Sequence, residues 1–262
     1  MERAPIDAQA LHGALDDRWT RIVVVDEDES TNATLLHDET APDRAVLVAE
    51  HQRSGRGRLD RTWTSPARAG LTFSVVVRPE APIRTWGWLP LLTGVALREA
   101  LVDTTGCDLA LKWPNDVLHV PSEAKVAGIL AQTSGEAVVI GVGLNVTTTS
   151  DELPVETATS LQLCGARNVD RTELLIAILR RLDTRLAQWS DVAGDAEACG
   201  LAADYRHACA TLRREVSVST TAGPVVTGRA IGIDPDGRLQ IEQDGRIETV
   251  GAGDVEHLRS SR

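Results

Sequence analysis

The sequence predicts an α+β domain built around a largely antiparallel sheet, followed by a small all-β module. In the first part of the chain, compact apolar and β-branched runs are joined by short polar turns, and amphipathic helical segments lie between them. This combination favours an α+β fold. From residue 215 onward, short strand-like runs are separated by glycine-containing turn pairs, which is typical of a small barrel or sandwich. We therefore divide the chain into residues 1–212 and 213–262.

The N-terminal part is expected to supply two helices and two strands before a long loop. A short helix is predicted over 7–18, and a β-branched strand over Ile22–Val25. Ser30-Thr31 precedes an apolar run, so a hydroxyl group is placed to cap a second helix. Ala45–Ala49 is a short apolar strand, and the glycine- and arginine-rich residues 51–70 are expected to form a loop.

The rest of the large domain alternates strands with helices. The clearest helix covers 171–188, because Asp170 and Glu173 make a capping-box-like start ahead of an apolar stripe. Gly106 is placed to end an earlier helix. The other predicted elements are strands over Leu71–Val77, Leu109–Trp113, Val126–Ala131 and Ala137–Val142, and helices over 86–102 and 200–211.

Composition narrows the class of protein. The net charge of −11 argues against a general nucleic-acid binder, whose surface is usually strongly basic, and against binding to an anionic membrane. No run reaches about 18 apolar residues, so no membrane span is expected. The polar N-terminus lacks the apolar core of a signal peptide. The four cysteines form no Cys-x-x-Cys pair, and we expect free thiols in a cytoplasmic protein.

The segment Gln52–Trp63 is the first candidate site. Its glycines allow close approach of the backbone to a ligand, and its guanidinium groups match carboxylate or phosphate oxygens. On composition alone, a solvated basic surface loop has about equal weight, because arginines are mostly exposed. The segment is not a Walker loop, which ends in Gly-Lys-Ser/Thr. The residues concerned are Gly55, Arg56, Gly57, Arg58 and Arg61.

Three further strings carry polar groups at strand ends or glycines within strands. Each has an ordinary alternative when it is taken alone: a Pro-Asn-Asp turn, a strand headed by a lysine, and a glycine pair that only superficially resembles a dinucleotide fingerprint. The strings are Lys112-Trp113-Pro114-Asn115-Asp116, Lys125-Val126-Ala127-Gly128-Ile129-Leu130 and Ile140-Gly141-Val142-Gly143-Leu144-Asn145.

In their order and combination, these segments resemble the motifs of biotin–protein ligases. The resemblance begins at Ser30-Thr31-Asn32 and continues through Gln52–Trp63, which we call the glycine–arginine loop. It then includes the three later strings and extends to the C-terminal β module. It implies a catalytic domain related in fold to the class II aminoacyl-tRNA synthetases, with an SH3-like C-terminal barrel. It also implies two half-reactions. Biotin and ATP give biotinyl-5′-AMP and pyrophosphate, and a lysine of a biotin carboxyl carrier domain of a biotin-dependent carboxylase then displaces AMP.

Family members that act as repressors carry an N-terminal helix-turn-helix domain. Here only about 20 residues precede the first strand, too few for such a domain. We therefore expect no repressor function and neither a nucleic-acid nor a membrane partner, in a monomer or weak homodimer. Two rivals remain open at this point: a lipoate–protein ligase, and a non-catalytic biotin-binding protein.

The resemblance also assigns roles to individual residues. The catalytic groups are Lys125, Arg58 and Asp116, although a turn-capping role for Asp116 has nearly equal weight. Mg²⁺ is expected to arrive with ATP near Asn115, without a protein ligand set of its own. The biotin site is assigned Ser30, Thr31, Asn32, Gln52, Gly55, Arg56, Gly57, Arg58, Lys125, Gly128 and Gly141, with Asn32 alternatively steadying the local turn. The ATP site is assigned Arg58, Arg61, Trp63, Lys112, Asn115 and Asn145.

Overall fold

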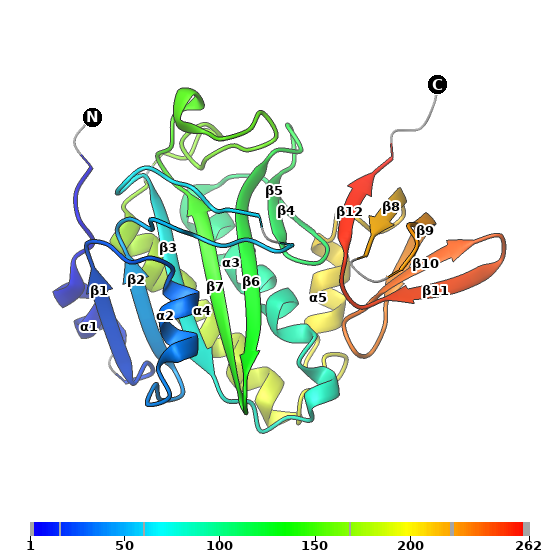
Figure 1. The fold of residues 1–262 in the computed structure, drawn as a ribbon, viewed down its shortest axis with the longest axis horizontal. Helices are drawn as coiled ribbons and strands as arrows, with labels where there is room; N and C mark the ends of the chain where they lie inside the picture. The colour runs from blue at the N-terminus through cyan, green and yellow to red at the C-terminus, as the bar shows by residue number, and fades with distance from the viewer. Residues whose placement is uncertain (1–2, 16, 60, 168, 221–222, 259–262) are drawn as a thin grey trace.

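A computed structural model describes residues 3–15, 17–59, 61–167, 169–220 and 223–258. A large α+β domain lies beside a small β domain at the C-terminal end (Figure 1). In the large sheet β1 is parallel to β2, and the neighbouring pairs from β2 onward are antiparallel. The predicted fold class is confirmed. The strand order is β1 (Arg21–Val25), β2 (Ala45–Ala49), β3 (Gly70–Val77), β7 (Ala137–Asn145), β6 (Lys125–Ser134), β5 (Asp116–His119) and β4 (Leu109–Lys112).

Helices cover both faces of this sheet. In Figure 1, α3 (Trp88–Thr105) and α4 (Arg171–Asp191) lie behind the central strands and α2 (Thr31–His37) lies in front of them. Every residue of β2 and β3 is therefore buried, which explains why these strands are largely apolar, with only Thr72 and Ser74 as polar residues in β3. The helices are α1 (Ala8–Leu15), α2 (Thr31–His37), α3 (Trp88–Thr105), α4 (Arg171–Asp191) and α5 (Leu201–Ala208), with 3₁₀ segments at Ile83–Thr85 and Ser150–Glu152.

The residues predicted to cap or end three helices, Ser30, Asp170 and Gly106, are confirmed in these roles. The Ser30 hydroxyl accepts a hydrogen bond from the Ala33 amide at the start of α2. Asp170 Oδ1 accepts the amides of the second and third residues of α4, at 2.8 and 3.0 Å. Gly106 ends α3 in the left-handed region, with φ of 70°, where glycine has no steric penalty.

Some element boundaries differ from the sequence prediction. The strand expected to reach Trp113 ends at Lys112, because the chain turns there and the Asn115 amide bonds back to the Lys112 carbonyl at 3.1 Å. The turn leads into β5, a short strand that was not predicted and that pairs Asp116 with Lys112. The helix expected over 7–18 covers only Ala8–Leu15.

The C-terminal domain is a five-stranded antiparallel sheet tied to the large domain by the turn between β9 and β10. The Trp88 indole N–H donates to the Pro235 carbonyl at 2.8 Å, and that of Trp113 donates to the Gly237 carbonyl at 3.2 Å. These buried anchors join the two domains. The strand order is β11 (Arg246–Val250), β10 (Leu239–Gln243), β9 (Val226–Ile233), β8 (Glu215–Ser219) and β12 (Asp254–His257).

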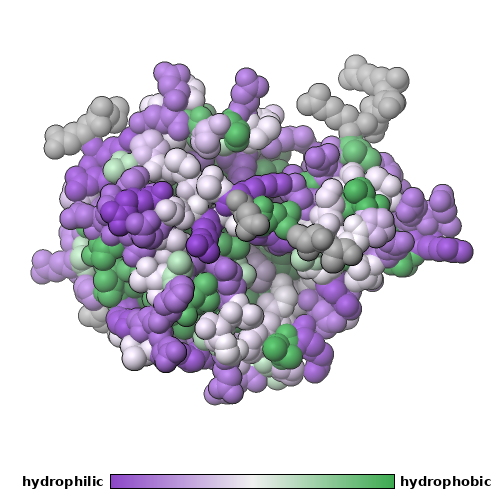
Figure 2. Space-filling model, viewed as in Figure 1, coloured by the Kyte–Doolittle hydropathy of each residue, from purple (hydrophilic) through white to green (hydrophobic). Residues whose placement is uncertain are grey.

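The face that carries α2 is mostly hydrophilic, with hydrophobic side chains in small separate patches (Figure 2). Within the described residues, no helix is long and apolar enough to cross a membrane. The four cysteines are free thiols, as predicted.

Candidate active site

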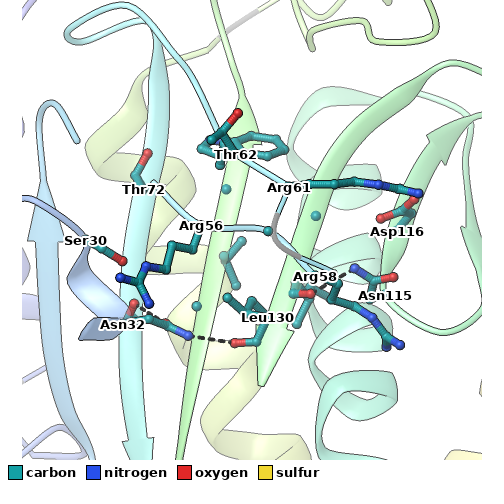
Figure 3. A pocket seen from close by; sticks show the side chains of 18 of the residues that line it. Ser30, Asn32, Arg56, Arg58, Arg61, Thr62, Thr72, Asn115, Asp116 and Leu130 are labelled. Carbon is teal, nitrogen blue, oxygen red and sulfur yellow. Dashed lines mark hydrogen bonds between the residues drawn. The ribbon is translucent and has the colours of Figure 1, made fainter. Parts of the chain in front are cut away.

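A pocket opens on the α2 side of the large sheet, beneath the glycine–arginine loop (Figure 3). Its floor comes from the central strands β3, β6 and β7, and its walls come from the start of α2, the loop and the start of β5. The C-terminal domain contributes Gly253 and Asp254. The pocket therefore unites segments from both domains.

Uncharged polar groups form the end of the pocket next to α2. The Thr31 amide and hydroxyl donate to Gln52 Oε1 at 2.8 and 3.0 Å, and the hydroxyls of Thr31 and Ser74 lie 2.7 Å apart. Ser74 Oγ donates to Asn32 Oδ1 at 2.6 Å. Asn32 Nδ2 in turn donates to the Leu130 carbonyl at 3.0 Å. Because its amide is engaged on both sides, Asn32 ties α2 to the sheet and orients its polar neighbours.

Glycines in β6 and β7 make room for the pocket. A Cβ atom at Gly141 would overlap Asn32 Oδ1, and one at Gly143 would overlap the Trp63 indole. One at Gly128 would lie 2.9 Å from Lys125 Nζ. The Trp63 ring therefore rests directly on the backbone of β7, where any side chain would displace it.

The loop folds back on itself and sets the direction of Trp63. The Gly57 amide donates to the Arg61 carbonyl at 2.7 Å, and the Trp63 amide donates to the Gly55 carbonyl at 2.8 Å. A Cβ atom at Gly55 would overlap the Trp63 carbonyl. These contacts leave the arginine side chains free to face the pocket.

Cations and two carboxylates share the opposite end of the pocket. Lys125 Nζ lies 2.6 Å from Asp116 Oδ1. Arg61 pairs with Asp254, whose hydrogen bond raises the pKa of the Arg61 guanidinium. Burial lowers the pKa of Arg58, and the charges of Asp116 and Asp254 oppose that shift. The result is a local cationic cluster in an otherwise acidic protein.

Aromatic and amide groups complete the site. Lys125 Nζ lies 5.8 Å from the centroid of the Trp63 ring, and the Trp63 indole N–H is buried without a hydrogen-bond partner among the described residues. Asn115 Nδ2 donates to the Ile129 carbonyl at 3.0 Å, so this residue joins the turn before β5 to β6. Figure 3 shows Arg56 directed toward Ser30 and Asn32, with Arg58 near Asn115.

The described residues contain no group of three or more His, Cys, Asp or Glu that could hold a metal ion. Guanidinium and ammonium groups instead suit carboxylate and phosphate oxygens. The pocket therefore fits a ligand or ligand pair that is mainly polar and uncharged next to α2 and carries its negative charge toward the arginines and Lys125.

Comparisons with known proteins identify the family. Residues 24–145 match the model of the biotin/lipoate A/B protein ligase family, and residues 211–258 match that of the biotin protein ligase C terminal domain. The biotin–[acetyl-CoA-carboxylase] ligase of Mycobacterium tuberculosis is 40% identical, over 98% of this chain and 97% of that protein. The chain belongs to the biotin protein ligase family.

Other members of this ligase family agree in sequence and in structure. The bifunctional ligase/repressor BirA of Escherichia coli is 31% identical, over 98% of this chain and 79% of its own length. The biotin protein ligase of Aquifex aeolicus, solved in complex with biotin and ATP, superimposes with a TM-score of 0.76 at 29% identity. The match covers 92% of this chain and 100% of that one.

Most residues assigned to this ligase site from the sequence line the pocket. They are Ser30, Thr31, Asn32, Gln52, Arg56, Gly57, Arg58, Arg61, Trp63, Asn115, Asp116, Lys125, Gly128 and Gly141. Gly55, Lys112 and Asn145 are not among the lining residues. Gly55 supports the loop fold, while Asn145 is buried and donates to the Thr159 carbonyl at 3.0 Å. Lys112 acts on a residue outside the pocket: its positive charge helps to lower the pKa of His257 in the C-terminal domain.

The pocket also contains residues that sequence reasoning missed. Ser74 lies in an apolar run, and only its alternation with Thr72 on one face of β3 could have indicated it. Asp254 lies 193 residues from its partner Arg61, so no local pattern connects them. The remaining additions are Leu59, Thr62, Thr72, Phe73, Val142, Gly143 and Gly253, while Ile129 and Leu130 belong to the strand string already singled out from the sequence.

Proposed function

We propose that the protein forms biotinyl-5′-AMP from biotin and ATP and then transfers the biotinyl group to a lysine of a biotin carboxyl carrier domain. The observation that carries this proposal is one pocket whose end next to α2 is lined mainly by uncharged hydrogen-bonding groups, with Arg56 directed toward it, and whose opposite end holds Arg58, Arg61 and Lys125. The names of the relatives from M. tuberculosis and Paracoccus denitrificans support an acetyl-CoA-carboxylase carrier as acceptor. The C-terminal family match favours biotin over lipoate.

Biotin would enter with its ureido group toward α2. Ser30, Thr31 and Gln52 offer the donors and acceptors that a ureido group needs. The bicyclic ring would lie beside the strand segments that contain Gly128 and Gly141, where the glycines let the side chains of Lys125 and Asn32 pack close to the backbone. The valeryl chain then directs the carboxylate to the glycine–arginine loop, with Arg56, Gly57 and Arg58 as its partners.

In the first half-reaction, a biotin carboxylate oxygen attacks the α-phosphorus of ATP. A new oxygen–phosphorus bond forms, and the bond to the bridging oxygen breaks as pyrophosphate leaves. Repulsion between the two anions is the obstacle, and the positive charges of Lys125 and Arg58 in a partly dry pocket reduce it.

The nucleotide would occupy the cationic end of the pocket. Trp63 offers a ring face to adenine, and Arg61 would bind the phosphates. Lys112 and Asn145, just outside the lining, remain assigned to the nucleotide. Mg²⁺ bound to ATP would supply further charge neutralisation, and Asn115 is the protein residue assigned to orient the metal or a phosphate.

In the second half-reaction, the acceptor amine attacks the acyl carbon of the mixed anhydride, and AMP leaves with the bridging oxygen. A lysine amine has an ordinary pKa of about 10.4 and must lose a proton before it attacks. Asp116, held 2.6 Å from Lys125, is the carboxylate in the pocket assigned to accept or position that proton.

Exchange of labelled pyrophosphate into ATP tests the first half-reaction. The purified protein should catalyse exchange with biotin, and at most weakly with lipoate at the same concentration. A carrier domain incubated with protein, biotin and ATP should gain the mass of one biotinyl group on its acceptor lysine. Exchange with lipoate alone, or biotin binding without exchange, would contradict the proposal.

A further inference from the structure

The site depends on a long connection between two neighbouring strands. Residues 50–69, which we call the ligand loop, join β2 to β3, and these strands pair directly with each other. Loops of this length lose much conformational entropy when they are ordered, and in compact domains they are often functional. The ligand loop carries Gln52, the arginines and Trp63, so its placement sets most of the pocket.

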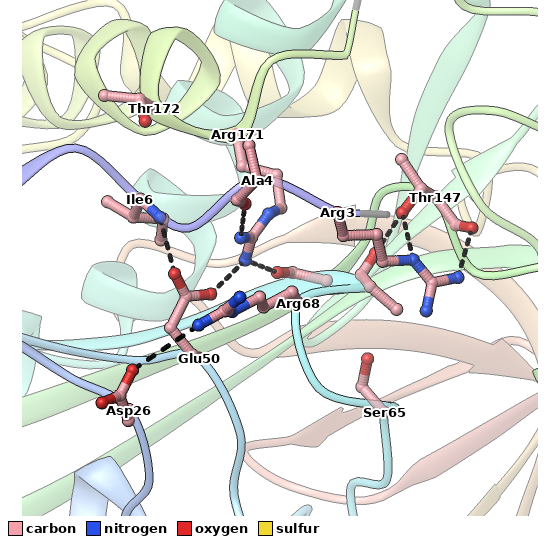
Figure 4. Close-up of polar contacts among 12 residues, drawn as sticks. Arg3, Ala4, Ile6, Asp26, Glu50, Ser65, Arg68, Thr147, Arg171 and Thr172 are labelled. Carbon is pink, nitrogen blue, oxygen red and sulfur yellow. Dashed lines mark hydrogen bonds and ion pairs between the residues drawn. The ribbon is translucent and has the colours of Figure 1, made fainter. Parts of the chain in front are cut away.

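One buried guanidinium group bonds to both ends of this loop. Arg171, the first residue of α4, donates through Nη1 to Glu50 Oε2 at 2.6 Å and to the Gly70 carbonyl at 3.1 Å. Glu50 is the first residue of the ligand loop, and Gly70 follows its last. The side chains of Arg171 and Glu50 are 6% and 4% exposed. Figure 4 shows Arg171 between Glu50 and Ala4, with the hydrogen bonds dashed.

The N-terminal segment that contains Ala4 and Ile6 packs against the same ion pair. Arg171 Nη2 donates to the Ala4 carbonyl at 2.5 Å, and the Ile6 amide donates to Glu50 Oε1 at 2.6 Å. Both oxygens of Glu50 are therefore engaged by different segments. The loop ends also bond to each other, because the Arg68 amide donates to the Glu50 carbonyl at 2.9 Å.

A buried ion pair is weak evidence for stability, because removing both charges from water offsets much of their attraction. Its best-supported use is to fix one arrangement among alternatives. Here the ion pair fixes the distance between the two ends of the loop. Gln52 lies only two residues after Glu50, so the position of Glu50 also sets that of Gln52. Gln52 Oε1 accepts the two hydrogen bonds of Thr31 in the pocket.

We infer that Arg171 is a positioning residue for biotin and ATP. By bonding to both ends of the ligand loop, it holds Gln52 and Trp63 in the positions from which they contact the substrates. This inference rests on the proposed function. Arg171 touches neither substrate and acts through the loop. The planar guanidinium group of Arg171 donates to Glu50, Gly70 and Ala4 at the same time. The ammonium group of a lysine, at the end of a flexible side chain, does not reproduce this set of hydrogen bonds.

The test compares Arg171→Lys with Arg3→Ala. The lysine variant keeps a positive charge beside Glu50 and a comparable helix propensity in α4. Arg3 belongs to the same N-terminal segment but bonds to Thr147 and Glu152, not to the ligand loop. Arg3→Ala therefore reports the effect of loosening this region without releasing the loop ends. Each variant is measured in pyrophosphate exchange, in thermal unfolding and in limited proteolysis without substrates.

We expect Arg171→Lys to raise the KM for biotin about tenfold or more, with a smaller change in kcat and recovery of the rate at high biotin, because displacement by about 1 Å can cost about 10²-fold. Cleavage within the ligand loop should accelerate in the same variant, while Arg3→Ala should resemble the wild type in both respects. A purely structural role would lower Tm and kcat, through loss of folded enzyme, and leave KM unchanged.

Glu50→Gln supplies a second variant, in case Arg171→Lys folds poorly. It keeps the shape of the side chain and should also raise the KM for biotin. The inference is wrong if both variants share the KM and the loop cleavage rate of Arg3→Ala. Absence of exchange in the wild type would contradict the proposed function instead, while loop cleavage would still test whether Arg171 holds the loop.

Discussion

At the residue scale, Lys125 and Asp116 hold opposite charges where the chemistry is proposed to occur. Lys125 Nζ lies 2.6 Å from Asp116 Oδ1, and neither side chain is fully buried, at 33% and 20% exposed. A partly exposed pair of this kind adds little to stability. Its consequence is placement: the ammonium group is held over the strand glycine Gly128 and within 5.8 Å of the Trp63 ring centroid.

Replacing Lys125 with Met tests the role of its charge. Loss of one preorganised electrostatic group in an active site commonly costs about 10²- to 10³-fold in rate, and we expect a loss of that size in biotin-dependent pyrophosphate exchange. Lys125→Arg should retain part of the activity because it keeps the charge. Thermal unfolding of Lys125→Met should change by only a few degrees, since the side chain is one-third exposed.

Arg53→Met is the matched control for Lys125→Met. Arg53 is a cation of the ligand loop, but it pairs with Glu27 and Glu29 outside the pocket. It should therefore leave exchange near the wild-type rate. Near-normal exchange in Lys125→Met would remove Lys125 from the mechanism.

At the element scale, features decided by neighbouring residues could be predicted, and features decided by packing could not. The caps at Ser30 and Asp170 and the stop at Gly106 follow from local hydrogen bonding and backbone freedom. The strand β5 was missed because four residues after a turn carry too little pattern. Arg171 was missed as a loop anchor because its partner Glu50 lies 121 positions away.

The same distinction holds within the candidate site. The loop and its arginines could be located from composition, and the family resemblance ordered the other motifs. The sequence did not show that the Trp63 ring packs on the backbone of Gly143, because that contact exists only when the loop folds back over β7. It also placed Lys112 and Asn145 with the nucleotide, although neither side chain lines the pocket.

Gly143→Ala tests the packing of the loop on β7. The new methyl group would overlap the Trp63 indole, and the backbone beneath it pairs on both sides with Thr72 and Gly128, so it has little room to shift. We expect the ring to be displaced and the KM values for biotin and ATP to rise about tenfold or more, since the ring lines the shared pocket.

Gly13→Ala is the control for this substitution. A Cβ atom at Gly13 meets nothing within 4 Å, and alanine is favoured by about 1 kcal/mol over glycine inside a helix. It should leave both KM values unchanged. Unaltered kinetics in Gly143→Ala would show that the position of the Trp63 ring does not matter for substrate binding.

At the scale of the whole molecule, the C-terminal domain belongs to the active site as well as to the fold. Asp254 pairs with Arg61, and the Gly253 carbonyl accepts a hydrogen bond from Arg58 at 3.5 Å. Both contacts reach the cationic end of the pocket. Because Arg61 is 61% exposed, its pair with Asp254 is weak and open to competition from a phosphate group. If Arg61 binds the phosphates of ATP as proposed, nucleotide binding would compete with this contact between the two domains.

His257 links the stability of this junction to pH. It lies in β12, its ring contacts Thr211 Oγ1 at 3.1 Å, and burial together with the charges of Lys112 and Arg214 lowers its pKa to about 4. The unfolded chain has the ordinary histidine pKa of about 6.5, so between these values the unfolded state binds the extra proton. This contribution to stability is complete above pH 6.5 and is lost as the pH falls toward 4.

We therefore expect thermal unfolding measured from pH 7 to pH 4.5 to show a smaller fall in stability for His257→Gln than for the wild type. The difference should be about 1–2 kcal/mol, after allowance for partial solvent exposure of the ring. His207→Gln, at an exposed position on α5, should follow the wild-type pH profile. If His257→Gln and the wild type lose stability in parallel, the domain junction does not carry this pH dependence.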